Sequence, residues 1–319
     1  MQTLTAESKA VKQTPNHKTT RIFRQRGLSI VELLVALTIG LFLILAVIEV
    51  MISGKQSFGS ANNMSRLQEN GRIATEMVVT NLKRAGYMGG NSDIDRINGT
   101  LPPLDPAPAC ATNNTNWVRM IEEPVFGLND TNAGYACITD AEYLRGDVLT
   151  VRHAAPWIEA GALNGGSVYL RSSLFDGNIF LGADSADPTN AVLDVPNNVR
   201  ELLAYSYFVG DSGRTCDGEA IPSLFRVRVD GNGRPVSEEL LPGIEDFQVQ
   251  YGDAPRYYDA DDVPDWEAIL TVRIWILVRA ECNENGFDDG RTYMMGDQAY
   301  TPGDDFLRQL YTNVVMIRN

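Results

Sequence analysis

The chain has 319 residues and a formal net charge of −14, because 41 acidic residues outnumber 27 basic ones. Hydrophobic residues make up 44% and charged residues 21%, an ordinary globular composition that excludes a disordered or collagen-like chain. The acidic total also argues against a nucleic-acid partner, because such a protein needs a basic face toward the phosphates.

The charge is unevenly distributed along the chain. Residues 1–27 hold six basic residues and one acid, a net of +5, so the other 292 residues carry −19. Lys and Arg beside a first apolar segment keep that end of a chain in the cytoplasm. The sequence therefore predicts a basic leader, an apolar membrane segment and an acidic body outside the cytoplasm.

An apolar stretch runs from Leu28 to Ile52, and residues 33–48 contain no charge. About 20 helical residues cross a bilayer core, so residues 28–52 are long enough to span it. A secretory signal peptide would have a shorter apolar core and then a small-residue cleavage site, which is not found here. No proline occurs between Pro15 and Pro102, so the helix is expected to continue past the membrane.

Residues 53–90 are predicted to form the amphipathic second half of this helix. Apolar or small residues recur there at steps of three or four, which places them on one helix face. These residues are Met64, Leu67, Gly71, Ala74, Val78, Leu82 and Ala85. A plain membrane anchor with a stalk helix packed on a domain is the simpler alternative.

The rest of the chain, residues 91–319, is predicted to be a domain of mainly antiparallel β-sheet. Apolar or alternating runs indicate strands, and the most apolar run, residues 269–279, is expected in the centre of its sheet. The other expected strands are 147–152, 167–170, 225–230, 247–251 and, less clearly, 314–318. The fold class is therefore α+β, a long N-terminal α-helix packed on a mainly antiparallel sheet domain.

Three segments of this domain have loop-like compositions. Residues 99–142 are rich in proline and asparagine and are expected to form an irregular insertion. Residues 182–198 and 283–305 contain many Gly, Asp, Pro and Asn residues and are also expected to be loops. A short turn sequence, Asp230–Gly233, is predicted to join two strands.

Four cysteines lie beyond the membrane segment, where disulfides persist. They are Cys110, Cys137, Cys216 and Cys282, an even number that allows two bridges in three connectivities. We favour Cys110–Cys137, which would close the irregular insertion, together with Cys216–Cys282. Separate reduced thiols are the alternative. No C-x-x-C occurs, so a zinc ribbon or a thioredoxin-type site has no support.

Catalysis and cofactor binding have little support in the sequence. His153 is the one histidine beyond the leader, which weakens catalytic schemes and metal sites that need imidazole. No P-loop and no G-x-G-x-x-G is present, so the chain is not a motor ATPase. We expect a protein that is not an enzyme, with no catalytic residues and no cofactor.

Acidic loops offer a candidate cation site. None has the EF-hand spacing, so solvated acidic loops are favoured over bound calcium. The acidic groups are Asp259 with Asp261 and Asp262, Asp288 with Asp289, and Asp304 with Asp305.

The segment Arg26–Leu33 (RGLSIVEL) resembles the class III signal of type IV prepilins and pseudopilins. The resemblance implies that a prepilin peptidase cuts after Gly27 and that the new N-terminus, Leu28, is methylated. Glu32 would then be the fifth residue of the mature chain. In pilin-like assemblies this Glu meets the N-terminal amine of a neighbouring subunit and sets the register. Leu28 departs from the Phe that is usual at the first position.

A second resemblance narrows the family. Residues 66–74 (RLQENGRIA) and 83–90 (KRAGYMGG) resemble the PilW group of minor pilins. Gly90 stands where that group often has Cys. Further similar segments are 205–209, 224–226, 239–252, Trp266, 272–279 and 311–319, and the last of them also resembles J-type pseudopilins.

The resemblance implies a pilin-like fold and a minor pilin that takes part in type IV pilus assembly, as a priming or tip-complex subunit. Its expected partners are other minor and major pilins, the prepilin peptidase and the inner-membrane assembly platform. The chain would be a single-pass inner-membrane protein with a periplasmic body, and later part of the pilus at the cell surface. The alternatives are a J-type pseudopilin of type II secretion and, from another class, a membrane-anchored periplasmic enzyme or binding protein.

Overall fold

The computed structural model describes Gly27, residues 29–101, Cys110, and residues 115–192, 194–284 and 286–317. The leader residues 1–26, Leu28 and much of the proline-rich part of the 99–142 insertion lie outside the described residues. The chain divides into two compact units, Met1–Gln56 and Ser57–Asn319, and each is described by itself.

The predicted long helix is confirmed as α1, Ile30–Leu82. It ends at Leu82 and not near residue 90, so the expected extent of the amphipathic half is corrected. Gly86, Gly89 and Gly90 have φ angles of 76°, 70° and 102°, a left-handed conformation that ends a helix. The Gly86 amide donates a hydrogen bond to Arg152 O at 3.1 Å, so the chain turns onto the sheet here.

The predicted stripe on the second half of α1 packs in the interior of the second unit. Its members Leu67, Gly71, Ala74, Val78 and Leu82 are all buried. Ala85, in the turn after the helix, is buried as well, whereas Met64, the first residue of the stripe, is 39% exposed. The helical spacing therefore identified the packed face of the helix.

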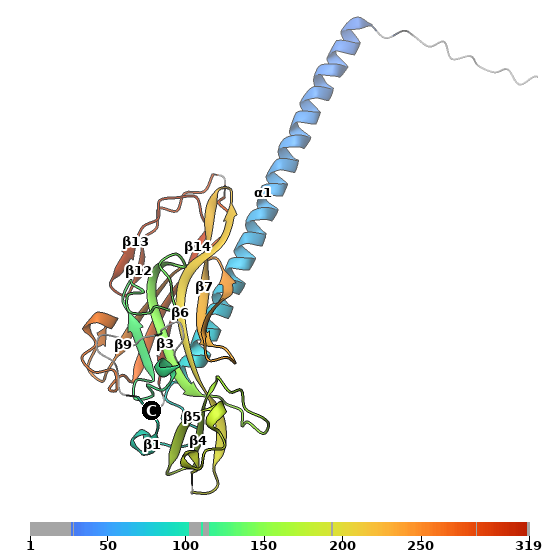
Figure 1. Ribbon diagram of the computed structural model, residues 1–319. Coiled ribbons are helices and arrows are strands. Elements are labelled where there is room, and N and C mark those ends of the chain that lie inside the picture. Colours follow the sequence, from blue (N-terminus) through green and yellow to red (C-terminus); the bar gives the residue numbers. More distant parts are fainter. Residues whose placement is uncertain are drawn as a thin grey trace, which may run out of the picture. The chain divides into compact units, whose positions relative to one another are not determined.

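The second unit contains a large branched sheet (Figure 1). Its strand order is β1-β5-β4-β6-β3-β2, and β7 pairs with both β6 and β8. All of its pairings are antiparallel except β1 with β5. The strands are β1 (Ile97–Asn98), β2 (Val125–Leu128), β3 (Tyr143–Ala154), β4 (Val168–Ser172), β5 (Gly177–Leu181), β6 (Asn198–Cys216), β7 (Glu219–Val229) and β8 (Pro235–Pro242).

A second, antiparallel sheet has the order β10-β9-β11-β14, and a separate hairpin pairs β12 with β13. As predicted, the apolar strand β11 is central, because it is hydrogen-bonded on both sides. The strands are β9 (Ile244–Gly252), β10 (Tyr257–Tyr258), β11 (Thr271–Arg279), β12 (Tyr293–Met295), β13 (Gln298–Tyr300) and β14 (Arg308–Met316).

Two segments expected to be loops contain regular structure. The 99–142 insertion includes β2, which pairs with β3, and residues 283–305 include the β12–β13 hairpin. Both are corrections to the sequence prediction. The strands β2, β12 and β13 have only three or four residues, which is too short for an alternating pattern to be recognised in the sequence. They are strands because they form hydrogen bonds with neighbouring strands. Short 3-10 helices occur at Ile94–Arg96, Asn116–Val118, Gly182–Asp184, Pro188–Asn190 and Ala260–Asp262.

The main hydrophobic core lies among the buried stripe of α1 and the two sheets. β11 contributes to it with alternate residues, from Val272 to Val278, whereas Trp275 and Leu277 face a small core with the β12–β13 hairpin. A further core covers the other face of the large sheet and contains Trp117 and Phe208. Both faces of each main sheet are therefore partly covered, which explains why alternation is weak in the central strands.

The turn at Asp230–Gly233 joins β7 to β8, as predicted. The Asp230 carboxylate accepts hydrogen bonds from the amides of Asn232 and Arg234, at 2.9 and 2.8 Å. Gly233 has a φ of 79°, a conformation that glycine adopts without strain.

Substitution of Gly71 tests the packing of α1 on β14. A Cβ at this position would lie 2.0 Å from Cε2 of Tyr311, so Gly71→Ala should lower the free energy of unfolding by about 1–3 kcal/mol through overpacking. Denaturant unfolding of the chain in detergent, followed by fluorescence of its buried tryptophans, measures this.

Gly59→Ala is the matched control, because Gly59 is on the same helix with nothing within 4 Å of its Cβ position. It should stabilise by about 0.5–1 kcal/mol. Equal effects of the two substitutions would contradict the packing role of Gly71.

Candidate functional site

The first half of α1 is apolar and uncovered within its own unit. Its large apolar side chains between Ile30 and Ile52 are 47% to 78% exposed. Among the described residues, α1 is the one helix long and apolar enough to cross a membrane. An apolar surface of this extent needs lipid or other helices around it, because its exposure to water is highly unfavourable.

The candidate processing site lies just before this helix. Gly27 is exposed, and nothing lies within 4 Å of where its Cβ would be. Leu28, the expected new N-terminus, lies outside the described residues. Glu32 is in the first turn of α1, where a carboxylate complements the free amides of the helix start. The processing and methylation roles of these residues stay predictions.

Segments that resemble the PilW group, far apart in the sequence, meet at the second half of α1. Asn70 Nδ2 donates a hydrogen bond to Pro242 O at 3.0 Å, and the Tyr311 hydroxyl donates one to Gln68 O at 3.3 Å. Gly71 provides the space for the Tyr311 ring. The family-like helix segment therefore acts in this fold as a packing site for β14 and for the turn between β8 and β9.

The end of α1 is tied to the sheet by buried polar side chains. Asn81 Nδ2 donates to the Tyr207 hydroxyl at 2.7 Å, and Asn81 Oδ1 lies 3.2 Å from Nε2 of His153. Burial lowers the pKa of His153 and raises the pKa of Tyr207 to about 12. The one histidine beyond the leader is therefore a buried link between helix and sheet.

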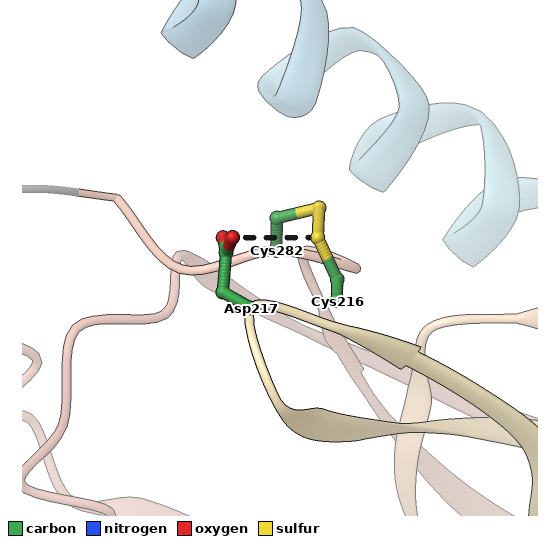
Figure 2. Close-up of side chains that lie close together, drawn as sticks. All are labelled: Cys216, Asp217 and Cys282. Carbon is green, nitrogen blue, oxygen red and sulfur yellow. Dashed lines mark hydrogen bonds between the residues drawn. A yellow bond between two sulfur atoms is a disulfide. The ribbon is translucent and has the colours of Figure 1, made fainter.

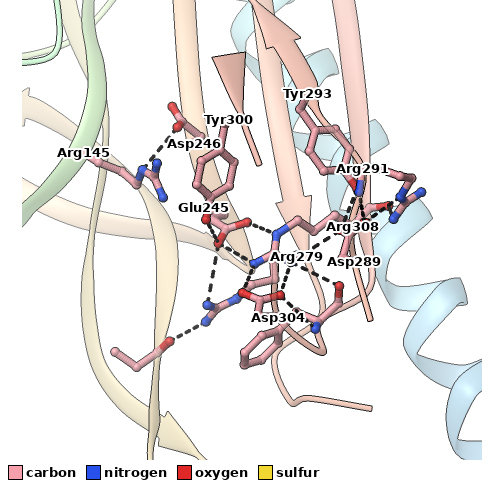
Figure 3. Close-up of polar contacts among 12 residues, drawn as sticks. Arg145, Glu245, Asp246, Arg279, Asp289, Arg291, Tyr293, Tyr300, Asp304 and Arg308 are labelled. Carbon is pink, nitrogen blue, oxygen red and sulfur yellow. Dashed lines mark hydrogen bonds and ion pairs between the residues drawn. The ribbon is translucent and has the colours of Figure 1, made fainter. Parts of the chain in front are cut away.

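A buried network of charges lies beside the second sheet, around Arg308 (Figure 3). The side chain of Arg308 is fully buried, and its Nη2 donates to Glu245 at 2.9 Å and to Asp304 at 2.7 Å. Asp289, also fully buried, accepts from Arg291 at 2.7 Å and from the Tyr293 hydroxyl at 2.8 Å. The network joins β9 and β14 to the loop that carries the β12–β13 hairpin.

The charges of this network stabilise one another. Burial alone would lower the pKa of Arg308, but hydrogen bonds to Glu245 and Asp304 raise it above the ordinary value. The hydrogen bonds from Arg308 lower the pKa of Asp304. Because a buried charge is very costly without a partner, the ion pairs hold the loop in place.

Several of the acids considered as cation ligands already have protein partners. Asp289 and Asp304 are paired with arginine as described, Asp259 accepts from Gln250 at 2.9 Å, and Asp305 accepts from Asn283 at 3.1 Å. These contacts give the acidic loops a structural role. Calcium binding by them stays the less favoured alternative.

The structure pairs Cys110 with Cys137 and Cys216 with Cys282, the connectivity favoured from the sequence. The first bridge closes part of the 99–142 insertion. The second joins the end of β6 to the segment after β11, beside Asp217 (Figure 2). Cys216, Cys282 and Asp217 are grouped closely enough to suggest metal ligands, but disulfide sulfurs offer no thiolate. This group is a covalent cross-link.

These features define a class of protein: an α+β chain that has, among its described residues, one candidate membrane helix and a disulfide-bonded β domain. Residues 206–319 match the model of a family described as Type IV Pilus-assembly protein W, PilW. The matched region runs from β6 to the end of the chain and includes β14 and the Arg308 network. No curated protein and no solved structure matches the chain significantly.

The match confirms the resemblance found in the sequence. This part of the chain, residues 206–319, is similar to the PilW family, and the similarity supports a role in type IV pilus assembly.

Replacement of Arg308 tests the buried network. Arg308→Met should lower the free energy of unfolding by about 3–5 kcal/mol, because Glu245 and Asp289 would be left as buried charges without this partner. Denaturant unfolding measures the change. Arg72→Met is the control, because Arg72 pairs with Glu76 at an exposed position of α1, where an ion pair contributes about 0–1 kcal/mol. Equal effects would contradict the structural role of the network.

Proposed function

We propose that this protein is a minor pilin that is built into the type IV pilus as a priming or tip-complex subunit. The observation that carries the proposal is the combination of a fully uncovered apolar helix half with a body that matches the PilW family. The apolar first half of α1 would be surrounded by lipid before assembly and by other pilin helices afterwards. The family match favours the pilus over a J-type pseudopilin of type II secretion.

In this proposal the chain enters the inner membrane once, with its basic leader in the cytoplasm and its acidic body in the periplasm. The prepilin peptidase removes residues 1–27 and Leu28 is methylated. The assembly platform then brings the helix against those of other minor and major pilins, and the mature subunit leaves the membrane as part of a pilus at the cell surface.

Glu32 would set the register of that helix packing. A carboxylate near the hydrocarbon core is costly unless it is paired, and the N-terminal amine of a neighbouring subunit is a partner of opposite charge. Such a buried pair contributes to specificity more than to raw stability, because much of its attraction offsets the loss of hydration.

Mass spectrometry of the protein from cells with active prepilin peptidase tests the processing. We expect a mature chain that begins at methylated Leu28. Cells that lack the peptidase should contain the chain with its leader and serve as the control. A chain that keeps residues 1–27 in the presence of the peptidase would contradict the minor pilin proposal.

Glu32→Ala tests the register contact. The variant should stay in the membrane at the wild-type level, but its recovery in sheared pili should fall at least about tenfold, as loss of a contact worth about 1.4 kcal/mol or more would give. Immunoblots of the membrane and sheared fractions measure both quantities.

Glu49→Ala is the matched control, because Glu49 is an exposed acid on the same helix, at the other end of the charge-free run. It should be recovered as the wild type is. Wild-type recovery of the Glu32 variant would count against a register role.

A further inference from the structure

A pocket of about 430 Å³ lies beside the end of α1. Its wall is the turn that follows the helix, together with the first residues after β3. Because a water molecule takes up about 30 Å³ in the liquid, the pocket has room for far more than one small ion. It is large enough for side chains of a neighbouring molecule. The lining residues that matter here are Lys83, Arg84, Tyr87, Asn91, Ser92 and Pro156.

Backbone hydrogen bonds fix the wall of the pocket to the large sheet. The amide of Gly86 donates to Arg152 O at 3.1 Å, and the amide of Ala154 donates to Tyr87 O at 2.7 Å. Arg152 and Ala154 both belong to β3, so the turn after α1 is held against a long strand. A molecule that enters the pocket meets a preformed surface, and its binding does not have to order this segment.

Two cations of the wall lack an acidic partner. Lys83 and Arg84 form no ion pair within the part of the chain that the structure describes. The acids Glu76 and Asp93, close to them in the sequence, are each paired with an arginine of their own segment, at 3.3 and 3.7 Å. Residues 28–319 carry a net charge of −19, so two adjacent cations without an acid are unusual in this body. Their field favours a negative group in the pocket.

A third cation lies behind the wall. Arg200 is only 9% exposed, its guanidinium lies 5.8 Å from the ring centre of Tyr87, and its Nη1 donates to Pro156 O at 2.8 Å. A second hydrogen bond from Nη1 goes to Ala155 O at 3.1 Å. Main-chain carbonyls do not neutralise a guanidinium, so the positive charge of Arg200 adds to that of the two lining cations.

A buried hydrogen-bond donor of the lining also lacks a partner. Asn91 is 6% exposed, and its Oδ1 accepts from the amide of Asp93 at 2.8 Å, which fixes the side-chain amide. Its Nδ2 has no hydrogen-bond partner among the described residues. A buried donor without a partner is costly. An acceptor oxygen that enters the pocket would remove this cost, because Asn91 is one of the residues that line it.

We propose that this pocket binds an acidic segment of a different pilin-type subunit. One carboxylate of the segment lies against Lys83 and Arg84 and accepts a hydrogen bond from Asn91 Nδ2. An apolar side chain beside it packs on Tyr87 and Pro156. A carboxylate offers both the negative charge and two acceptor oxygens, and the ring surfaces of the lining suit a peptide better than a free anion. The inference rests on the proposed function and adds a lateral contact of the body.

Two substitutions test the pocket in the full chain in cells. Lys83→Glu turns an attraction into a repulsion, so recovery in sheared pili should fall at least about tenfold. Asn91→Asp keeps the acceptor for the amide of Asp93 and replaces the free donor by a negative oxygen, and recovery should fall at least about fivefold. Resistance of the membrane-bound body to proteinase K shows whether each variant is folded. Lys83 is exposed, so its variant decides if the Asn91 variant does not fold.

Arg234→Glu is the matched control. It makes the same change of charge at an exposed position in the turn between β7 and β8, and should be recovered within about twofold of the wild type. Wild-type recovery of both pocket variants would overturn the acidic-segment contact while leaving the proposed function intact. Absence of the wild-type protein from pili would overturn the proposed function, and this inference with it.

A photo-cross-linker, benzoylphenylalanine, at the exposed lining residue Ser92 identifies the occupant in assembled pili. Mass spectrometry should map the cross-link to a segment with Asp or Glu in another prepilin-type protein. A Lys in place of that acid should restore recovery of Lys83→Glu to within about threefold of the wild type. A cross-link to a second copy of this chain, to a segment without an acid or to no subunit would overturn the inference, as would a failure of the rescue.

Discussion

The close approach of α1 to β14 is the contact on which the body depends. Gly71 lies against the ring of Tyr311, and a side chain at position 71 would have to displace that ring. The helix stripe from Leu67 to Leu82 then reaches the two sheets and closes the main core. In that core the helix face covers part of the apolar surface of β11 and β9. The body therefore includes the second half of the helix as one of its layers.

A second constraint is the strong negative charge of the body. The protein holds part of this charge in buried pairs, of which Arg308 with Glu245, Asp289 and Asp304 is the largest. Arg145 adds a pair with Asp246 at 3.2 Å and stacks on Tyr300 (Figure 3). These contacts connect the long loop after β11 to the sheet, because an acid in such a place needs its cationic partner. The acidic loop residues Asp289 and Asp304 are therefore structural.

The two halves of α1 are one continuous helix but have different surfaces. The first half is apolar on all sides, which suits lipid and other apolar helices. The second half has one apolar stripe, which suits a sheet on one side and water on the other. The change of pattern occurs without a proline or a break in the helix. The body leaves the apolar residues Val314 and Met316 exposed at the end of β14.

The sequence by itself determined the long helix, its buried face, the central position of β11 and the turn after β7, because each depends on local pattern and spacing. It also carried the resemblance that the match over residues 206–319 confirmed. Only the tertiary structure decided the end of α1 at Leu82, the strands inside the expected loops and the partners of Asp289 and Asp304. These features depend on contacts between residues far apart in the chain, such as the 63 positions between Glu245 and Arg308, and no local pattern records them.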